Sequence, residues 1–377
     1  MSSFRFVNGH VVTAAGTFRH AVITVDQGRI VSIAPEGSGN ETVDLNGGWI
    51  VPGFIDVQVN GGGGVLFNDA TTVEGIAAIG AAHAKFGTTG FLPTLISDAP
   101  EVIARALDAT DAAIEAGVPG VLGVHIEGPI LNKARKGIHD AEKFRGLDAA
   151  MVELLGRPRR GKVLVTLAPE MVDLADVRRL ADAGVLLAIG HSDATYETAR
   201  AAFGAGMTGV THLYNAMSPL LHRAPGVVGA ALENKTAYCG IIPDGFHVHD
   251  AALRIALAAR PHDRFLLVTD AMPNVGSNMT AFDLHGQHIR VDGGRLLGVD
   301  GTLAGSALDM TGAFRHMVTR IGTSPEDAAM MAAASPAAFL GLSHERGTLA
   351  PGLRADWVQM TRDFQPAGCW IGAIRFP

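Results

Sequence analysis

The middle of this chain alternates between apolar runs of strand length and alanine-rich stretches of helical type, and this alternation restricts the fold more than any other feature. Helical stretches such as "TVEGIAAIGAAHAKFG" and "TYETARAAFGAG" begin after candidate caps, among them Thr71 or Thr72, Asp98 and Asp173. The apolar runs lie near residues 50–57, 90–95, 121–127, 163–169, 186–191, 209–213, 238–243 and 265–270. Strands that alternate with helices form a parallel sheet. Eight such units over roughly 290 residues favour an α/β fold of the TIM-like (β/α)₈ barrel type, with an open doubly wound sheet as the alternative.

The two ends of the chain differ from the middle in their pattern of predicted secondary structure. Residues 1–51 contain short β-type runs separated by Asn-Gly, Gln-Gly and Gly-Gly turns, and "GTLAPGLRADWVQMT" and "CWIGAIRF" near the C-terminus are similar. We therefore expect a small β-sandwich domain formed by both termini. Its expected limits are 1–51 and 344–377, with the catalytic barrel at 52–343.

Composition excludes several classes of protein. Hydrophobic residues make up 47% of the 377 residues and charged residues only 18%, which indicates a well-buried core rather than disorder. A formal net charge of −7 without a long basic run argues against a nucleic-acid partner. The two cysteines, Cys239 and Cys369, form no CxxC motif, and no apolar stretch reaches about 18 residues. We expect a cytoplasmic protein with no membrane association.

Polar residues close several of the predicted strands, where the active site of a barrel lies. They are Glu127, His191, His212, His247 and Asp270. Glu127, His191 and His212 supply one oxygen and two nitrogens, a ligand set that leaves a position open to water in a catalytic metal site. Asp270 is the remaining carboxylate that takes a proton from that water.

Glu127 ends the run "VLGVHIEG", in which an ionised carboxylate is costly unless a cation or hydrogen bonds meet it. A divalent cation satisfies that requirement. His125 shares a strand face with Glu127, because residues i and i+2 point the same way. Two interpretations stay open for His125: it orients or packs against the site, or it contacts the metal directly.

Nine motifs occur in a fixed order between about residues 50 and 312: "VPGFIDVQVNG", "HIEGPILN", "KGIHD", "IGHSDAT", "THLYNAMSPL", "RAPGVVGA", "DGFHV", "VTDAMP" and "LAGSALDM". Together they resemble the N-acetylglucosamine-6-phosphate deacetylases of the amidohydrolase superfamily. The resemblance implies a metal-dependent amide hydrolase of amino-sugar catabolism. Its expected reaction is hydrolysis of the N-acetyl group of N-acetylglucosamine 6-phosphate to glucosamine 6-phosphate and acetate.

The resemblance also implies roles for single residues. Glu127, His191 and His212 bind the metal, and Asp270 acts first as base and then as acid toward the leaving amine. His139 polarises the acetyl oxygen. Arg223 reaches across a homodimer interface to the phosphate in the neighbouring subunit. The other expected substrate contacts are Asn215, Ala216 and His247 around the sugar phosphate and Leu303 beside the acetyl group.

One departure from the wider superfamily concerns the metal count. Many amidohydrolases carry His-x-His at the end of the first barrel strand, where this chain has Gln58 and Asn60. Amides are weaker ligands for a transition metal than imidazole, which favours one divalent ion per subunit, with zinc expected ahead of iron, cobalt or manganese.

Two alternatives to the deacetylase function stay open. They are an amidohydrolase for N-acylated amino acids or cyclic amides, and a catalytically silent barrel that serves as a binding protein. The sequence leaves acceptance of N-acetylgalactosamine 6-phosphate open.

Overall fold

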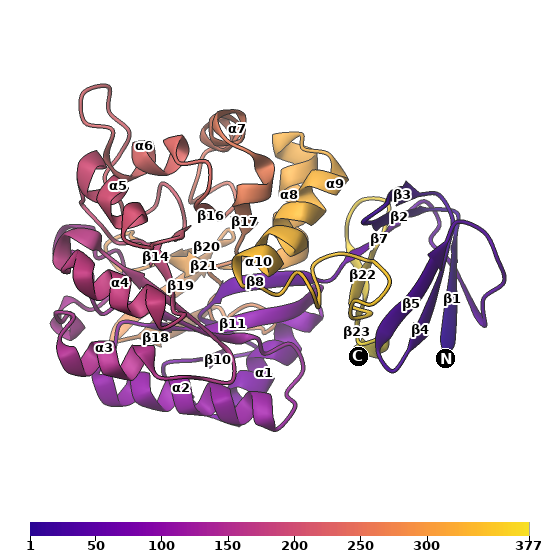
Figure 1. Cartoon of the computed structure of the whole chain (residues 1–377), viewed down its shortest axis with the longest axis horizontal. Helices are drawn as coiled ribbons and strands as arrows, with labels where there is room; N and C mark the ends of the chain where they lie inside the picture. The colour runs from indigo at the N-terminus through magenta and orange to yellow at the C-terminus, as the bar shows by residue number, and fades with distance from the viewer. Residues whose placement is uncertain (377) are drawn as a thin grey trace.

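The computed structural model describes residues 1–376 and contains a parallel eight-stranded barrel beside a smaller β domain (Figure 1). Neighbouring barrel strands follow one another along the chain, all in parallel register. The strands are β8 (Phe54–Val59), β11 (Thr88–Ile96), β12 (Gly123–Glu127), β13 (Lys162–Leu167), β14 (Leu186–Ile189), β15 (Gly209–Val210), β16 (Tyr238–Ile241) and β17 (Phe265–Leu267).

The last strand closes onto the first through main-chain hydrogen bonds. Asp270 N donates to Gln58 O, and Asn60 N donates to Ala271 O, each at 2.9 Å. These bonds decide between the two predicted architectures, because an open sheet would leave both edges unpaired. The barrel prediction is confirmed. Inward-facing apolar side chains, among them Leu164 and Leu266, fill its interior as a packed core.

Helices surround the barrel and connect its strands. They are α1 (Val73–Ala84), α2 (Pro100–Glu115), α3 (Ala149–Gly156), α4 (Leu174–Asp182), α5 (Tyr196–Gly204), α6 (Gly226–Glu233), α7 (Asp250–Ala259) and α8 (Met310–His316), followed by α9 (Pro325–Ala329) and α10 (Ser335–Phe339). Thr72 and Asp173 cap α1 and α4 as predicted. Asp98 does not cap α2: the N-cap is Ala99, and Asp98 accepts instead from Ala99 N. Across residues 1–376 every helix is too short or too polar to cross a bilayer.

Both termini build the small β domain, and their ends lie on it in Figure 1. One sheet has the order β5-β4-β1-β6 and the other β24-β23-β22-β7-β2-β3. The strands are β1 (Ser2–Val7), β2 (His10–Thr13), β3 (Gly16–Phe18), β4 (Ala21–Asp26), β5 (Arg29–Ala34), β6 (Glu41–Asp44), β7 (Trp49–Pro52), β22 (Trp357–Met360), β23 (Pro366–Ile371) and β24 (Ile374–Phe376). Between the sheets, the buried Trp357 packs edge-on against Phe4 and Phe6. The prediction of a β domain formed by both termini is confirmed.

The junction between the two domains corrects one expected strand. The apolar run near 50–57 is not one strand but two, because β7 pairs in the small domain and β8 begins the barrel. Gly53 separates them, and a Cβ there would lie 2.2 Å from the Thr89 hydroxyl. The exact domain limits stay a prediction. Along the chain, β7 is the last small-domain strand before the barrel and β22 is the first one after it.

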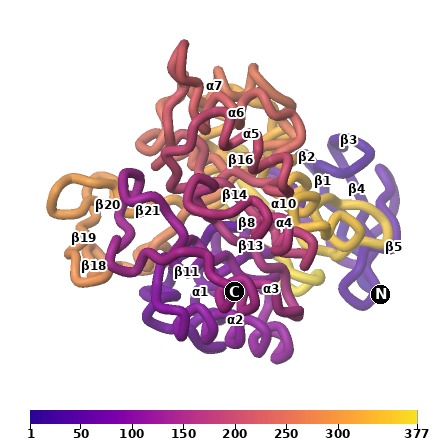
Figure 2. The backbone as a smooth tube through the Cα atoms, turned by 60° about the vertical axis from the view of Figure 1, so that its left-hand side comes forward, coloured from indigo at the N-terminus to yellow at the C-terminus, as the bar shows by residue number. Residues whose placement is uncertain are grey.

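A four-stranded antiparallel sheet leaves the barrel after β17, and the sequence reading did not anticipate it. Its strands are β18 (Ala281–Leu284), β19 (Gln287–Asp292), β20 (Arg295–Leu297) and β21 (Leu303–Ser306). Figure 2 shows it on the side of the barrel opposite the small β domain. The turns at His285-Gly286 and Gly293-Gly294 between alternating residues were the available signal.

Candidate active site

All eight barrel strands deliver a polar side chain to the carboxyl-terminal end of the barrel. In strand order these are Gln58 and Asn60, Ser97, Glu127, Glu170, His191, His212, His247 and Asp270. A cavity of about 400 Å³ opens among the side chains of six of these strand ends. That volume suits a ligand of small-molecule size.

Three donor atoms converge at the base of this cavity. Glu127 Oε1 lies 3.2 Å from His191 Nε2 and 3.0 Å from His212 Nε2, and the two nitrogens are 3.1 Å apart. Ligands at 2.0–2.1 Å around a tetrahedral zinc are separated by about 3.3 Å, so the three atoms already have the spacing of a metal face. All three side chains are buried.

The tautomer of His191 follows from its other ring nitrogen. Nδ1 lies 2.8 Å from Arg135 O, and a carbonyl oxygen only accepts, so Nδ1 carries the proton. Nε2 is the nitrogen that faces the Glu127 carboxylate, and in the neutral tautomer it can offer its lone pair to a metal ion. Burial alone would raise the pKa of Glu127, but the hydrogen bonds of His191 and His212 hold it well below its usual range. The buried Glu127 carboxylate therefore needs positive charge beside it, from imidazole protons or from a metal ion in their place.

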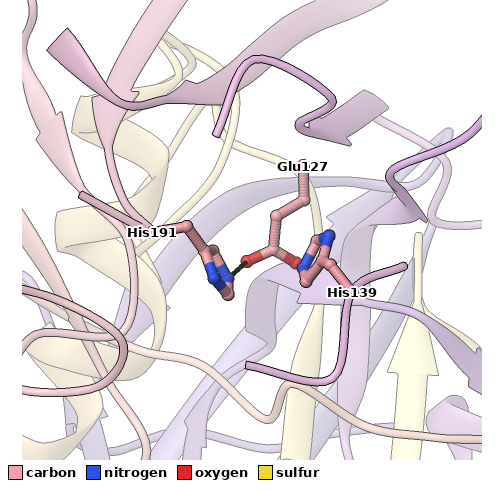
Figure 3. A group of neighbouring side chains, drawn as sticks. All are labelled: Glu127, His139 and His191. Carbon is pink, nitrogen blue, oxygen red and sulfur yellow. Dashed lines mark hydrogen bonds and ion pairs between the residues drawn. The ribbon is translucent and has the colours of Figure 1, made fainter. Parts of the chain in front are cut away.

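His139 adds a third imidazole to the group. Glu127, His139 and His191 each offer one atom within a common span of 4.8 Å, which makes them a second candidate ligand set. In Figure 3 the two imidazoles flank the Glu127 carboxylate. Burial, followed by the charge of His191, drives the pKa of His139 well below its usual value. Ser97 Oγ lies 2.8 Å from His139 Nδ1 and fixes the ring.

Two amides hold Asp270 on the opposite side. Gln58 Nε2 donates to Asp270 Oδ1 at 3.2 Å, and Asn60 Nδ2 donates to the same oxygen at 2.6 Å. Gln58 Nε2 also donates to Glu127 Oε1 at 3.2 Å. Burial, with the charge of Glu127, raises the pKa of Asp270 to about 6. Gln58 and Asn60 thus direct N–H donors, not lone pairs, toward the Asp270 carboxylate.

His125 is buried one layer below Glu127, and both its ring nitrogens face threonine hydroxyls. Nε2 lies 2.7 Å from Thr166 Oγ1 and Nδ1 lies 3.3 Å from Thr94 Oγ1. Thr166 Oγ1 continues to Thr211 Oγ1 at 2.6 Å. Of the two interpretations left open for His125, this geometry supports the orienting role, because both nitrogens already have partners.

Backbone strain is concentrated at the same strand ends. His191, His212 and Asp270 have φ values of 49°, 30° and 53°, and Ala216 follows at 48°. The left-handed region is unfavourable for residues with a Cβ and is found mainly where the surrounding structure imposes it, often at functional sites. The sharp turn lets each side chain point back over the barrel mouth.

The structure brings most of the predicted substrate contacts to the cavity. Asn215, Ala216, His247 and Leu303 line it together with His139. Asp244 Oδ2 accepts from His247 Nδ1 at 2.6 Å, which directs Nε2 away from this carboxylate. The catalytic, metal and binding roles themselves stay predictions.

Arg223 is the exception. It is exposed in the loop between β15 and α6, and it does not line the cavity in the described chain. Leu220 and Leu221 beside it are more than half exposed, at 52% and 55%.

Sequence reasoning missed two residues of this site, Ser97 and Glu170. Ser97 follows β11 and contacts His139, whereas Glu170 follows β13 and contacts Ser192 Oγ at 2.7 Å. Their position directly after predicted strands was the available signal. Neither residue type is diagnostic of a site when it stands alone.

A closed parallel barrel with buried carboxylates and imidazoles at its strand ends defines a hydrolase scaffold of the metal-dependent type. Residues 49–373 match the model of the Amidohydrolase family. The chain belongs to the amidohydrolase family, which confirms the family predicted from its motifs.

Known relatives agree over most of the chain. An N-acetylgalactosamine-6-phosphate deacetylase of Shewanella sp. (strain ANA-3) is 41% identical, over 96% of this chain and 93% of that protein. The human N-acetylglucosamine-6-phosphate deacetylase is 38% identical, over 85% of this chain and 81% of its own length. The crystal structure of N-acetylglucosamine-6-phosphate deacetylase from Pasteurella multocida superimposes with a TM-score of 0.94 at 32% identity, covering 98% of both chains.

A buried histidine supports the turn that carries Asn60 into the site. Strands β9 (Gly61–Gly62) and β10 (Val65–Leu66) form this turn, and His83 Nε2 of α1 donates to Gly61 O at 2.9 Å. Burial lowers the pKa of His83 to about 4. The folded protein therefore disfavours a proton that the unfolded chain accepts near pH 6.5.

We predict that His83 makes the fold less stable as the pH falls. The unfolded chain binds more protons between pH 6.5 and pH 4, so stability declines over this window, by about 2 kcal/mol at pH 5. In His83→Gln, which keeps a donor for Gly61, the loss of unfolding free energy from pH 7.5 to pH 5 should shrink by that amount. Urea unfolding at both pH values, with excess chelator present, measures the unfolding free energy of each protein. The exposed His288→Gln serves as control, and equal pH dependence in all three proteins would contradict the assignment.

Proposed function

We propose that this chain hydrolyses the N-acetyl group of N-acetylglucosamine 6-phosphate, releasing acetate and glucosamine 6-phosphate. The observation that carries the proposal is the convergence of Glu127 Oε1, His191 Nε2 and His212 Nε2 within 3.0–3.2 Å beside Asp270. The substrates printed in the names of the relatives supply the substrate class. The silent-barrel alternative is disfavoured because the ligand set and the base are all present.

The proposed metal ligands are Glu127, His191 and His212. Their three donor atoms lie within 3.2 Å of one another. A divalent ion held by these residues would lower the pKa of a bound water and polarise a carbonyl. We propose one ion per subunit, because Gln58 and Asn60 direct amide donors toward Asp270. Zinc is the expected metal, since the donor set is imidazole and carboxylate.

Asp270 is the proposed proton carrier. Within residues 1–376 both amides that hold Asp270 donate to Oδ1, so Oδ2 is available to the attacking water. Asp270 takes a proton from this water and returns it to the amine that leaves. His139, fixed through Nδ1 by Ser97, hydrogen-bonds the acetyl oxygen from the cavity wall. Leu303 borders the acetyl methyl group.

Asn215, the backbone at Ala216 and His247 are the proposed contacts of the sugar phosphate. The N-acetylgalactosamine epimer is a second candidate substrate, because the Shewanella relative carries that name at 41% identity. The two sugars differ only in the configuration of one hydroxyl group, so both keep the amide and the phosphate on which the proposed contacts act.

We further propose a homodimer in which Arg223 reaches the partner's phosphate site. The exposed Leu220 and Leu221 beside it supply apolar area for such a contact. The free, buried Cys239 and Cys369 are typical of a reducing compartment, and we propose a cytoplasmic location.

We predict metal-dependent acetate release from phosphorylated N-acetylhexosamines. Acetate is measured with the glucosamine and galactosamine epimers and with unphosphorylated N-acetylglucosamine, before and after treatment with a chelator. Phosphorylated substrate should be strongly preferred, and activity should reach its maximum at about one zinc per chain. Comparable rates on an N-acylated amino acid would instead favour the other amidohydrolase reading.

We predict that metal retention separates ligands from acid–base residues. Asp270→Asn should lower kcat by about 10²–10⁴-fold and keep the metal, because it removes only the proton acceptor. His139→Asn should also keep the metal, whereas His212→Ala should lose it. Elemental analysis of the three purified variants gives the result. Loss of metal from His139→Asn with retention in His212→Ala would reverse the proposed ligand set.

We predict that Arg223 acts between subunits. Arg223→Ala should raise KM for the phosphorylated sugar more than it lowers kcat, because a guanidinium binds phosphate through paired donors. Mixing inactive Asp270→Asn with Arg223→Ala protein should restore activity, since a mixed dimer has one site with both groups. Random pairing of equal amounts would give about a quarter of the wild-type rate. No recovery, with subunit exchange verified by mass spectrometry, would place Arg223 outside any partner site.

A further inference from the structure

The site contains a set of contacts that the proposed mechanism does not use. They join the segment of residues 132–139, here the His139 segment, to residues 191–193, here the His191 turn. We propose that Glu170 and the Arg135–Asp193 ion pair are positioning residues that couple metal binding at His191 to the ordering of the His139 segment. This inference rests on the proposed function for its metal and substrate.

Glu170 joins the two segments through one carboxylate. Its Oε1 accepts from Asn132 Nδ2 at 2.9 Å and from Asp193 N at 2.6 Å, and its Oε2 accepts from Ser192 Oγ at 2.7 Å. The residue lies in a short 3₁₀ turn (Pro169–Met171) directly after β13. Three donors from two segments therefore meet an anion held by the rigid barrel, and charge-assisted bonds of this kind are the stronger ones.

Arg135 joins the same segments a second time. Its side chain pairs with Asp193 Oδ1 at 2.8 Å, while its carbonyl accepts the Nδ1 proton of His191 at 2.8 Å. Asn132 N also donates to His191 O at 3.0 Å. The main chain of the His139 segment thus fixes both the ring orientation and the backbone of a proposed ligand. Partners of this kind raise ligand basicity and affect metal affinity.

The far end of the His139 segment forms the cavity wall. Gly137, Ile138 and His139 line the cavity. Ser97 and the Lys143–Asp98 ion pair hold this end to the residues that follow β11, and the His139 ring also packs against the His191 ring at 4.3 Å between centroids. Residues 132–137 contain all the hydrogen bonds described above that join the His139 segment to Glu170 and to the His191 turn. Because coupling between two equilibria is reciprocal, order gained on metal binding equals metal affinity gained from an ordered segment.

Hydrogen exchange and metal affinity test the coupling without an activity assay. Exchange of the peptide spanning 132–137 is followed by mass spectrometry with and without zinc, and the zinc Kd is obtained by chelator competition. Zinc should slow this exchange in the wild-type protein. Arg135→Ala and Glu170→Ala should each weaken zinc binding about tenfold or more, as other partners of metal ligands do. Lys133→Ala is the matched control, since it removes one exposed charge from the same segment.

Activity supplies a readout that separates positioning from damage. Arg135→Ala should lose activity at limiting zinc and recover it at excess zinc, because the metal then orders the segment. Exchange unaffected by zinc, or an Arg135→Ala affinity equal to that of Lys133→Ala, would overturn the proposal. Failure of the wild-type protein to release acetate, with the exchange and affinity results as expected, would reject the proposed function alone. Should Glu170→Ala not fold, Arg135→Ala decides the outcome.

Discussion

The buried carboxylate of Glu127 is the interaction on which the rest of the site depends. It meets two imidazole nitrogens at 3.0 and 3.2 Å, and the contact of His191 Nδ1 with Arg135 O orients one of the two rings. A buried anion without compensating charge costs several kcal/mol, which a divalent cation offsets. Glu127 lies at the carboxyl-terminal end of the barrel, where β12 ends, and the two imidazoles follow β14 and β15 at the same end.

The backbone at the strand ends is strained, and the rigid barrel holds it in that conformation. The φ values of His191, His212 and Asp270 lie in the left-handed region, at a cost of about 1–3 kcal/mol each. The closed barrel supplies that energy, because its ladder of parallel strands and packed interior hold the strand ends regardless of the local preference. Gly190 shows how closely the turn is packed, since a Cβ there would lie 2.5 Å from Thr166 Cγ2. Rigidity of the scaffold thus keeps the donor atoms within metal-binding distance of one another.

The sequence predicted the barrel and the residues at its mouth because both depend on local pattern. Apolar runs ending in Glu127, His191 or Asp270 are visible in one dimension, and the parallel barrel places all such ends on one face. Other features depend on the third dimension. The four-stranded antiparallel sheet at 281–306 was missed because its short strands contain few apolar residues in a regular pattern. The division of residues 50–57 into two strands follows from the pairing of β7 with β22, which is distant in sequence. Ser97 and Glu170 are common residue types whose partners lie far away in sequence.

Gln58 and Asn60 determine the local electrostatics around Asp270. Imidazoles at these positions would present lone pairs and attract a second cation, whereas the amides present hydrogens to Asp270 and Glu127. The amides bond one oxygen of Asp270. Burial raises the pKa of Asp270 to about 6, even though the Asn60 hydrogen bond lowers it, and this value is close to the range in which a group both accepts and donates a proton at neutral pH. A bound cation lowers that pKa through its positive charge, while the amides neither add nor remove charge. The amide pair thus holds the carboxylate in place without changing its charge, so that a bound cation, under the one-metal proposal, would be the group that adjusts it.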